Sequence, residues 1–322
     1  MVSCQCSYER EPPSSILEKS IPFSLLPSAA EALLLSSKVR PEPSNLPEGV
    51  FTMNQPSNDV IRQNVRNRYK QAAVSEIGND PFALTEQSKT SCCGTLPDVN
   101  TISSRLGYTK EELDAVPDGA NLGLGCGNPQ GIASLKPGEA VLDLGSGGGF
   151  DCFLASRQVG NNGRVIGVDM TPEMISRARQ NALKGGFTNT EFRLGEIEHL
   201  PVADQSVDVI ISNCVINLSP DKQQVFEDSF RVLKPGGRLA IADIVTTAEL
   251  PPAIKNDLNE LYAGCISGAS SISEFESMLL RSGFTGISIE AKEESRSFIR
   301  DWIRGSKIDD YIVSAMIRAV KP

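Results

Sequence analysis

The chain has 322 residues, of which 40% are hydrophobic and 22% charged, as in an ordinary soluble globular protein. Its formal net charge of −9 argues against nucleic acid or an anionic membrane as the main partner, because both require a basic face. The sequence contains no run of about 18 apolar residues, so it predicts no transmembrane helix. The N-terminus has no apolar stretch behind a basic segment, so we expect no secretory signal and a cytoplasmic location.

Cysteine and histidine content limits the chemistry further. The chain has eight cysteines, which in a cytoplasmic protein should be mostly free thiols. Their spacing does not match the paired C-x-x-C of zinc sites, and His199 is the only histidine. A Ser/His/Asp or Cys/His triad is therefore not expected.

In the first third of the chain, the sequence predicts an extension followed by helices. Residues 1–57 are rich in proline and serine, with one short helical candidate at 27–38, and we expect a partly disordered extension. Apolar residues recur at helical spacing over 59–77, which predicts an amphipathic helix. A capping box of Thr109 and Glu112 opens the next helix.

Strands and helices then alternate in the region 58–245. Apolar runs predict strands over 140–145, 164–170, 190–195, 207–213 and 238–245. Helices are predicted over 150–159, after Thr171-Pro172-Glu173, and over 222–233, opened by Ser219-Pro220-Asp221 and stopped by the Lys-Pro-Gly-Gly segment 234–237. This alternation predicts an α/β fold with a Rossmann-like, doubly wound and mostly parallel sheet.

The pattern changes in residues 246–322, where we expect a smaller C-terminal α+β region. Helices are predicted over 252–264 and 271–283, followed by a strand over 286–294 and a helical tail. We expect the protein to be a monomer.

A glycine-rich turn follows the first strand, in the segment VLDLGSGGGFD (141–151). Gly145 and Gly147 let a ligand approach the backbone closely, and Asp169 at the end of the next strand can accept both hydroxyls of a ribose. Phe150 replaces the last glycine of the dinucleotide fingerprint. Asp143 would repel a pyrophosphate but attract an ammonium or sulfonium group, which favours S-adenosylmethionine over NAD.

Three cysteines lie where small neighbours leave the sulfur approachable. The strand 207–213 ends at Asn213, so Cys214 should emerge at the carboxyl edge of the sheet, close to the cofactor. Cys126 lies between glycines and Cys265 among small residues, so the three thiols could meet over the cofactor cleft. The alternative is that each simply packs in the core, which we expect of Cys152.

Two cysteine pairs lie earlier in the chain. Cys92 and Cys93 are adjacent on a loop and are predicted to be a redox partner or a lid over the site. Cys4 and Cys6 lie in the extension, where a C-x-C pair could bind a soft metal.

Together, several segments resemble the arsenite S-adenosylmethionine methyltransferases, a family of class I methyltransferases. The resemblance covers about residues 59–322 and is carried by the segments TSCCG, NLGLGCGNP, SNCVINLSPDK, RVLKPGGRLAIADI and YAGCISGA. It implies that Cys126, Cys214 and Cys265 bind As(III), and that Cys92 or Cys93 exchanges disulfides with Cys126. The implied cofactor site is made of Asp143, Gly145, Ser146, Gly147, Asp169, Met170, Ile197, Glu198 and Asn213.

The chemistry of these residues agrees with that resemblance. As(III) is soft and prefers thiolates to imidazole or carboxylate. An arsenic atom on three thiolates keeps a lone pair that can attack a sulfonium methyl group without a general base. The expected substrates are arsenite and methylarsenite, with glutathione or a thioredoxin system as reductant. The alternatives are methylation of a small organic metabolite of the quinone or sterol type, and a sensor that binds arsenic without turnover.

Overall fold

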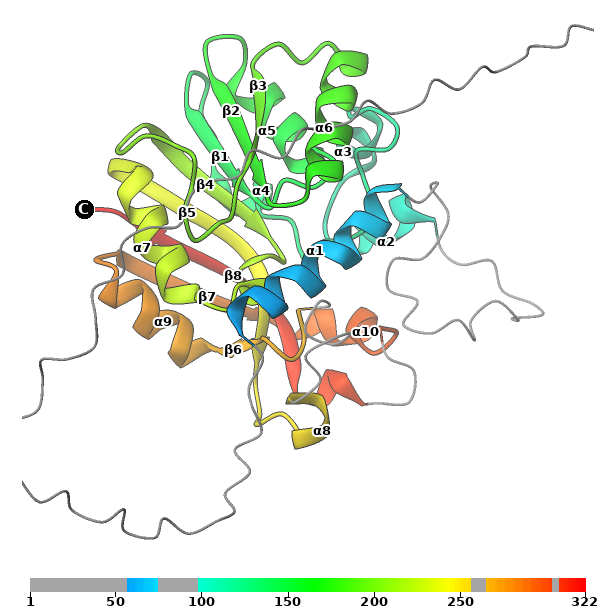
Figure 1. The fold of residues 1–322 in the computed structure, drawn as a ribbon, viewed down its shortest axis with the longest axis vertical. Coiled ribbons are helices and arrows are strands. Elements are labelled where there is room, and N and C mark those ends of the chain that lie inside the picture. Colours follow the sequence, from blue (N-terminus) through cyan, green and yellow to red (C-terminus); the bar gives the residue numbers. More distant parts are fainter. Residues whose placement is uncertain (1–56, 75–97, 256–264, 303–306) are drawn as a thin grey trace, which may run out of the picture. The chain divides into compact units, whose positions relative to one another are not determined.

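The computed structural model describes residues 57–74, 98–255, 265–302 and 307–322 (Figure 1). Several predicted features lie outside these residues: nearly all of the extension 1–57, the helical candidate 27–38, the cysteines Cys4, Cys6, Cys92 and Cys93, and most of the helix expected over 252–264. Within the described part of the chain, no helix has the length and hydropathy needed to cross a bilayer.

One sheet organises residues 98–322, with the strand order β3-β2-β1-β4-β5-β8-β7 and the short β6 paired to β5. The strands are β1 (Ala140–Leu144), β2 (Arg164–Asp169), β3 (Thr190–Leu194), β4 (Val207–Asn213), β5 (Leu233–Thr246), β6 (Ser270–Ser271), β7 (Thr285–Lys292) and β8 (Ile312–Val320). β1 to β6 pair in parallel, whereas β8 pairs antiparallel with both β5 and β7. The predicted Rossmann-like α/β fold with a mostly parallel sheet is confirmed.

Helices cover both faces of this sheet (Figure 1). The α-helices of the described residues are α1 (Asn58–Val74), α2 (Val99–Arg105), α3 (Lys110–Asp114), α4 (Gln130–Ala133), α5 (Phe150–Val159), α6 (Pro172–Gly185), α7 (Lys222–Val232), α8 (Pro252–Lys255), α9 (Ile272–Arg281) and α10 (Arg296–Ile299). Alternate residues of β1 serve the two faces, since Leu142 packs in one cluster with Phe226 and Phe275 of α7 and α9. Val141 packs in the other cluster, with Phe153 of α5. Such two-sided burial explains the continuous apolar strands.

The helix starts agree with the sequence in two cases and differ in one. Thr109 and Glu112 form the predicted capping box of α3, and Pro172 occupies the first turn of α6. α7, however, is capped by Asp221, whose side chain accepts a hydrogen bond from the backbone of Gln224. Ser219 lies two residues before this cap, and its hydroxyl oxygen accepts a hydrogen bond from the Asp221 N–H at 3.1 Å while the hydroxyl donates to Glu198 at 2.7 Å.

The sequence predicts that the Lys-Pro-Gly-Gly segment 234–237 separates α7 from the next strand. In the structure this segment belongs to the strand. α7 ends at Val232, and β5 already begins at Leu233. Leu233 pairs with Val207 and Arg238 with Val209, so the intervening residues form an irregularity within the strand. Gly236 permits it by adopting a φ of 77°.

The predicted helical tail is wrong, because the chain ends in the nine-residue strand β8 after the short helix α10. β8 lies between β5 and β7, and its first four residues, Ile312 to Ala315, are all buried, so this half of the strand is covered on both faces. Burial on both faces gives a strand a continuous apolar sequence without the alternation that would distinguish it from a helix. The residues 246–322 thus contribute three strands to the same sheet.

Two glycines give a test of how tightly β2 packs against the glycine-rich turn. A Cβ atom at Gly167 would lie 2.7 Å from both Phe192 Cδ1 and Ser146 Cβ. We expect Gly167→Ala to lower the free energy of unfolding by about 1–3 kcal/mol, measured by urea denaturation, because the core must shift to admit the methyl group.

Gly131 in α4 is the matched control, since nothing lies within 4 Å of a Cβ atom there. Gly131→Ala should leave the protein unchanged or stabilise it by up to ~1 kcal/mol, because alanine restricts the unfolded chain. Equal stability of the two variants would contradict the packing described for Gly167.

Candidate functional site

A cleft with about 1080 Å³ of empty space, part of it open to solvent, lies at the carboxyl ends of β1, β2 and β4. This is the edge where ligands bind in doubly wound sheets. The residues predicted for the cofactor all line this cleft: Asp143, Gly145, Ser146, Gly147, Asp169, Met170, Ile197, Glu198 and Asn213. Cys214 lines it as well, whereas Cys126 and Cys265 do not line it and pack with Cys214 in one cluster.

In the glycine-rich turn, Gly145 and Gly147 both have a positive φ, but the first is also closely packed and the second faces open space. At Gly145 the φ is 71°, and a Cβ atom would lie 2.4 Å from Val215 Cγ2, so only glycine fits. At Gly147 the φ is 50°, and the position of a Cβ atom is open space. The Gly147 N–H donates to Asp169 Oδ2 at 3.0 Å, which connects the turn to the end of β2.

Ser146 provides a test of whether the turn fits a cofactor. Its hydroxyl oxygen is buried and has no hydrogen-bond partner among the described residues. Buried polar groups are nearly always paired, so an orphaned hydroxyl on the lining of a cleft fits a ligand that supplies the partner. The ribose and amino-acid groups of S-adenosylmethionine offer such partners.

Four buried carboxylates, each at most 8% exposed, line the cleft: Asp143, Asp151, Asp169 and Glu198, of which Glu198 is paired with Arg62. Burial raises the pKa of Asp143, and the charge of Asp151 raises it further. Burial also raises the pKa of Asp151 to about 6 and that of Asp169 above its usual value. A cationic ligand would stabilise the ionised carboxylates, whereas a pyrophosphate would be repelled.

Tyr108 and Asp151 belong to the cleft although the sequence did not single them out. The Tyr108 hydroxyl donates to Asp151 Oδ1 at 2.8 Å. The Asn213 amide donates to Asp151 Oδ2 at 3.2 Å and to the Tyr108 hydroxyl at 3.0 Å. Asp151 could have been noticed because it closes the glycine-rich motif, but Tyr108 lies 43 residues earlier without a motif of its own.

Asn213 also positions the loop that carries Cys126. The Cys126 N–H donates to Asn213 Oδ1 at 3.0 Å, and the Cys126 carbonyl accepts a hydrogen bond from Ser314 Oγ of β8 at 2.6 Å. Both neighbouring glycines are required by close contacts. A Cβ atom would lie 2.7 Å from Asn213 Nδ2 at Gly125, and 2.7 Å from Met316 Cε at Gly127.

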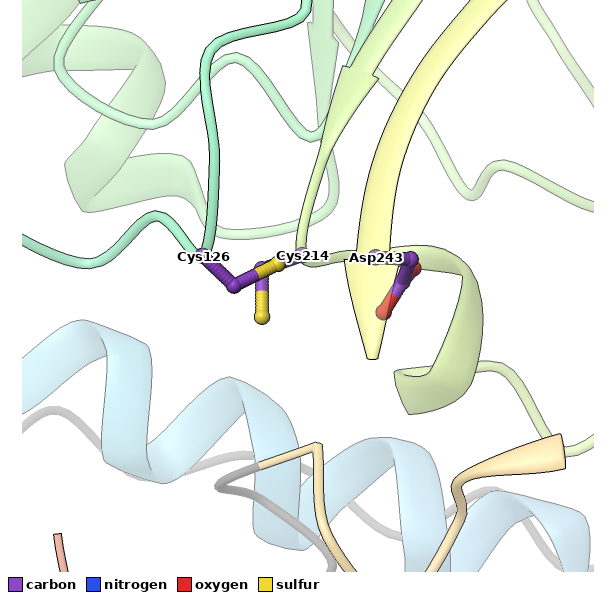
Figure 2. A group of neighbouring side chains, drawn as sticks. All are labelled: Cys126, Cys214 and Asp243. Carbon is purple, nitrogen blue, oxygen red and sulfur yellow. The ribbon is translucent and has the colours of Figure 1, made fainter. Parts of the chain in front are cut away.

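The three predicted thiols gather where these segments meet. The sulfurs of Cys126 and Cys214 and a carboxylate oxygen of Asp243 all lie within 4.8 Å of one another, and the side chains extend toward α1 (Figure 2). Cys265 Sγ lies 2.9 Å from the Cys214 carbonyl oxygen, to which the thiol donates. All three cysteines are at most 3% exposed.

Their surroundings keep these thiols protonated. Burial raises the pKa of Cys126 to about 11. The contact with Cys126, together with burial, raises the pKa of Cys214, and the contact with Cys214, together with burial, raises that of Cys265. The cluster is therefore neutral at physiological pH, and a ligand must displace the thiol protons to bind.

Cys152 is buried as predicted, but it does more than pack. Its sulfur lies 3.2 Å from Asp143 Oδ2, to which the thiol donates. The negative charge of Asp143 raises the pKa of Cys152, after the larger effect of burial. Cys152 thus supports a carboxylate of the cleft and lies apart from the three-cysteine cluster.

Helix α1 covers the cleft and the thiols. Val65 is only 1% exposed and packs in one cluster with the three cysteines, and Tyr69 packs against it. The helix is held by ion pairs from Arg62 to Glu198 at 3.3 Å and from Lys70 to Glu173 at 3.0 Å. Its predicted apolar face is the one that closes the site.

The chain is similar to known methyltransferases. A family model described as a methyltransferase domain matches residues 135–283. An arsenite methyltransferase from Halobacterium salinarum is 52% identical over 267 residues, which are 82% of this chain and 67% of that protein. An arsenite methyltransferase from Homo sapiens is 42% identical over 45% of this chain and 40% of its own length.

A solved structure gives the same similarity at the level of the fold. The arsenic (III) S-adenosylmethionine methyltransferase from Chlamydomonas reinhardtii is 32% identical, with a TM-score of 0.52 over 70% of this chain and 74% of that one. A phosphoethanolamine N-methyltransferase from Haemonchus contortus, at 19% identity and a TM-score of 0.50, shares the fold alone.

The raised pKa of Asp151 predicts how ligand binding depends on pH. Asp151 is protonated below about pH 6 and ionised above it, and a cationic ligand prefers the ionised form. The affinity for S-adenosylmethionine should therefore fall roughly fourfold between about pH 7.5 and about pH 5.5, measured by equilibrium dialysis. Asp151→Asn should weaken this dependence, whereas Glu111→Gln on the exposed face of α3 should retain it. An affinity that rises on acidification would contradict the prediction.

Proposed function

Since this chain belongs to the arsenite methyltransferase family, we propose that it transfers methyl groups from S-adenosylmethionine to arsenite and then to methylarsenite. It is an S-adenosylmethionine-dependent methyltransferase. The finer proposal concerns the substrate and the residues that hold it, and it assigns the protein a role in arsenic detoxification.

The cofactor would be held by the residues of the cleft. When bound, S-adenosylmethionine supplies an electrophilic methyl group on a sulfonium. Asp169 at the end of β2 would accept the ribose hydroxyls, and Met170 with Ile197 and Glu198 would surround the adenine. Asp143 and Asp151 would face the cationic end of the ligand, since both carboxylates are buried without a cationic partner among the described residues.

The substrate would bind to Cys126, Cys214 and Cys265. Each thiol can displace one hydroxide of arsenous acid, and its own proton leaves with that hydroxide as water. This balance needs no separate base, which agrees with three protonated thiols in a site without histidine. Soft thiolates are the preferred ligands of a soft metalloid.

One observation carries this proposal: Cys214 lies both in the thiol cluster and on the wall of the cofactor cleft. An arsenic atom on the three sulfurs would keep its lone pair on the side opposite to them. With that lone pair facing the methyl group, transfer is a direct displacement. Positioning supplies most of the acceleration, because a fixed reactive geometry can contribute roughly 7–11 kcal/mol.

Transfer of the methyl group to the arsenic lone pair raises arsenic from the trivalent to the pentavalent state, so release of a trivalent product requires two electrons. Protein thiols could supply them if Cys126 forms a disulfide with Cys92 or with Cys93. Cys92 and Cys93 lie outside the described residues. Glutathione or a thioredoxin system would then restore the thiols by disulfide exchange.

A direct test incubates the protein with arsenite, a thiol reductant and S-adenosylmethionine labelled in the methyl group. We expect label in methylated arsenic, separated by chromatography and identified by its arsenic content. Label in an organic acceptor of the quinone type and none in arsenic would replace the proposal by the metabolite alternative. Tight binding of As(III) without label transfer would identify a sensor.

Single cysteine variants test the three-thiolate site. Cys214→Ser and Cys265→Ser should each lower arsenite methylation by more than the roughly 10–100-fold typical of residues that only support a ligand. Cys126→Ser should impair arsenite methylation most and methylarsenite methylation least, because a methylated arsenical has only two bonds available for sulfur.

Cys152→Ser serves as the control, since Cys152 is equally buried but contacts Asp143 on the cofactor side. It should retain the wild-type stoichiometry of As(III) binding. Full methylation activity in Cys214→Ser or Cys265→Ser would refute the three-thiolate arrangement.

A further inference from the structure

Two of the thiol-bearing residues have an unusual backbone. Cys214 has a φ of 59° and Cys265 a φ of 64°, so both lie in the left-handed region that favours glycine. This conformation is costly for a residue with a side chain, and it persists only where the surrounding structure enforces it. The described chain has a specific set of contacts that hold the Cys214 turn and the segment following Cys265.

The first contacts act on the turn after β4. The Cys214 N–H donates to the carbonyl of Ala242 in β5 at 2.8 Å. Two residues later, the Ile216 N–H donates to Asp243 Oδ2 at 2.9 Å. The turn that holds Cys214 is therefore bonded on both sides to consecutive residues of β5, and the conformation between these two bonds is restricted.

Asn217 extends this connection to the segment that carries Cys265. Its amide group donates to Asp243 Oδ1 at 2.9 Å and to the Ile244 carbonyl. Its oxygen accepts a hydrogen bond from the N–H of Ser270 at 3.2 Å. Ser270 is the first residue of β6, five positions after Cys265, and pairs with Val245 of β5.

Asn217 and Asp243 are each 0% exposed, and neither lines the cofactor cleft. We infer that Asn217 and Asp243 are positioning residues for As(III) binding, because together they fix the Cys214 turn and the Cys265 segment against β5. This inference rests on the proposed function, since it assumes that Cys214 and Cys265 bind the same arsenic atom. Figure 2 shows Asp243 on β5 beside the two cysteines.

The alternative is that the pair only stabilises the fold, as buried polar pairs often do. Asp243 already accepts hydrogen bonds from Ile216, Ile244 and Asn217, so its carboxylate is satisfied without a ligand. A purely structural role would lower stability without distinguishing the two substrates. A positioning role affects the arsenical and leaves the cofactor cleft intact, so the two roles can be separated by experiment.

The test measures both substrates in Asn217→Ala. We expect the KM for arsenite to rise about 10–100-fold, with the KM for S-adenosylmethionine within about twofold of the wild-type value. Affinity for phenylarsine oxide, which bridges two thiols, should fall at least about tenfold in a Cys126→Ser background, where Cys214 and Cys265 remain in the cluster.

Ser212→Ala is the matched control. Ser212 is also 0% exposed near the end of β4, but its hydroxyl donates only to the Leu144 carbonyl, at 3.3 Å. It should lower stability without a selective effect on the arsenical. Should Asn217→Ala fail to fold, Asp243→Asn removes acceptor capacity from the same network while preserving side-chain volume.

The outcomes separate this inference from the proposed function. If wild-type protein neither binds nor methylates arsenicals, the proposed function fails. The positioning role is overturned if wild-type protein binds and methylates arsenicals, but adding Asn217→Ala or Asp243→Asn to a folded Cys126→Ser protein leaves its affinity for phenylarsine oxide unchanged. Hydrogen exchange of the wild-type protein adds a third readout, because fast exchange of the Ile216 and Ser270 amides would also overturn it.

Discussion

The backbone of Cys214 turns left-handed directly where β4 ends, and both halves of the site depend on that turn. A strand that continued straight would carry the Cys214 sulfur away from Cys126 and would leave Gly145 without its close contact to Val215. The turn is maintained by hydrogen bonds to β5, a central strand that lies between β4 and β8 in the sheet. A central strand of this kind is a rigid support, so a costly backbone conformation can persist there.

Burial governs the chemistry of the two halves in opposite ways. In the cofactor cleft, burial disfavours the ionised carboxylates of Asp143 and Asp151, so a cationic ligand gains from restoring them. In the thiol cluster, burial keeps the cysteines protonated until a thiophilic ligand replaces the protons. Burial thus favours a cationic ligand beside the carboxylates of the cleft, and it keeps the thiols on the other side of Cys214 neutral.

Much of this arrangement could be predicted from sequence because the decisive signals are local. The glycine-rich turn, the acid at the end of β2 and the position of Cys214 after β4 are each encoded within a few residues. Asp143, Asp169 and Asn213, which the sequence assigns to the cofactor site, all line the cleft. The β8 strand was mistaken for helix because its burial on both faces removes the alternation by which strands are identified.

Other parts of the site could not be predicted because their partners are distant in sequence. Tyr108 reaches Asp151 across 43 residues, and the Asn217 oxygen reaches the Ser270 amide across 53. Ser219 opens the predicted helix in the sequence, but in the structure its hydroxyl donates to Glu198, 21 residues earlier, and Asp221 caps α7. Such pairings follow from topology, and no single segment contains the information.

The hydrogen bond from Ser314 to the Cys126 carbonyl has a consequence for the order of folding. It joins residues 188 positions apart, and β8 can offer Ser314 only after pairing with β5. The entropy of closing so long a loop delays contacts of this kind relative to local ones. The Cys126 loop therefore gains this contact only when the sheet is nearly complete, so a partly folded chain can already contain the cleft while its Cys126 loop lacks the support of β8.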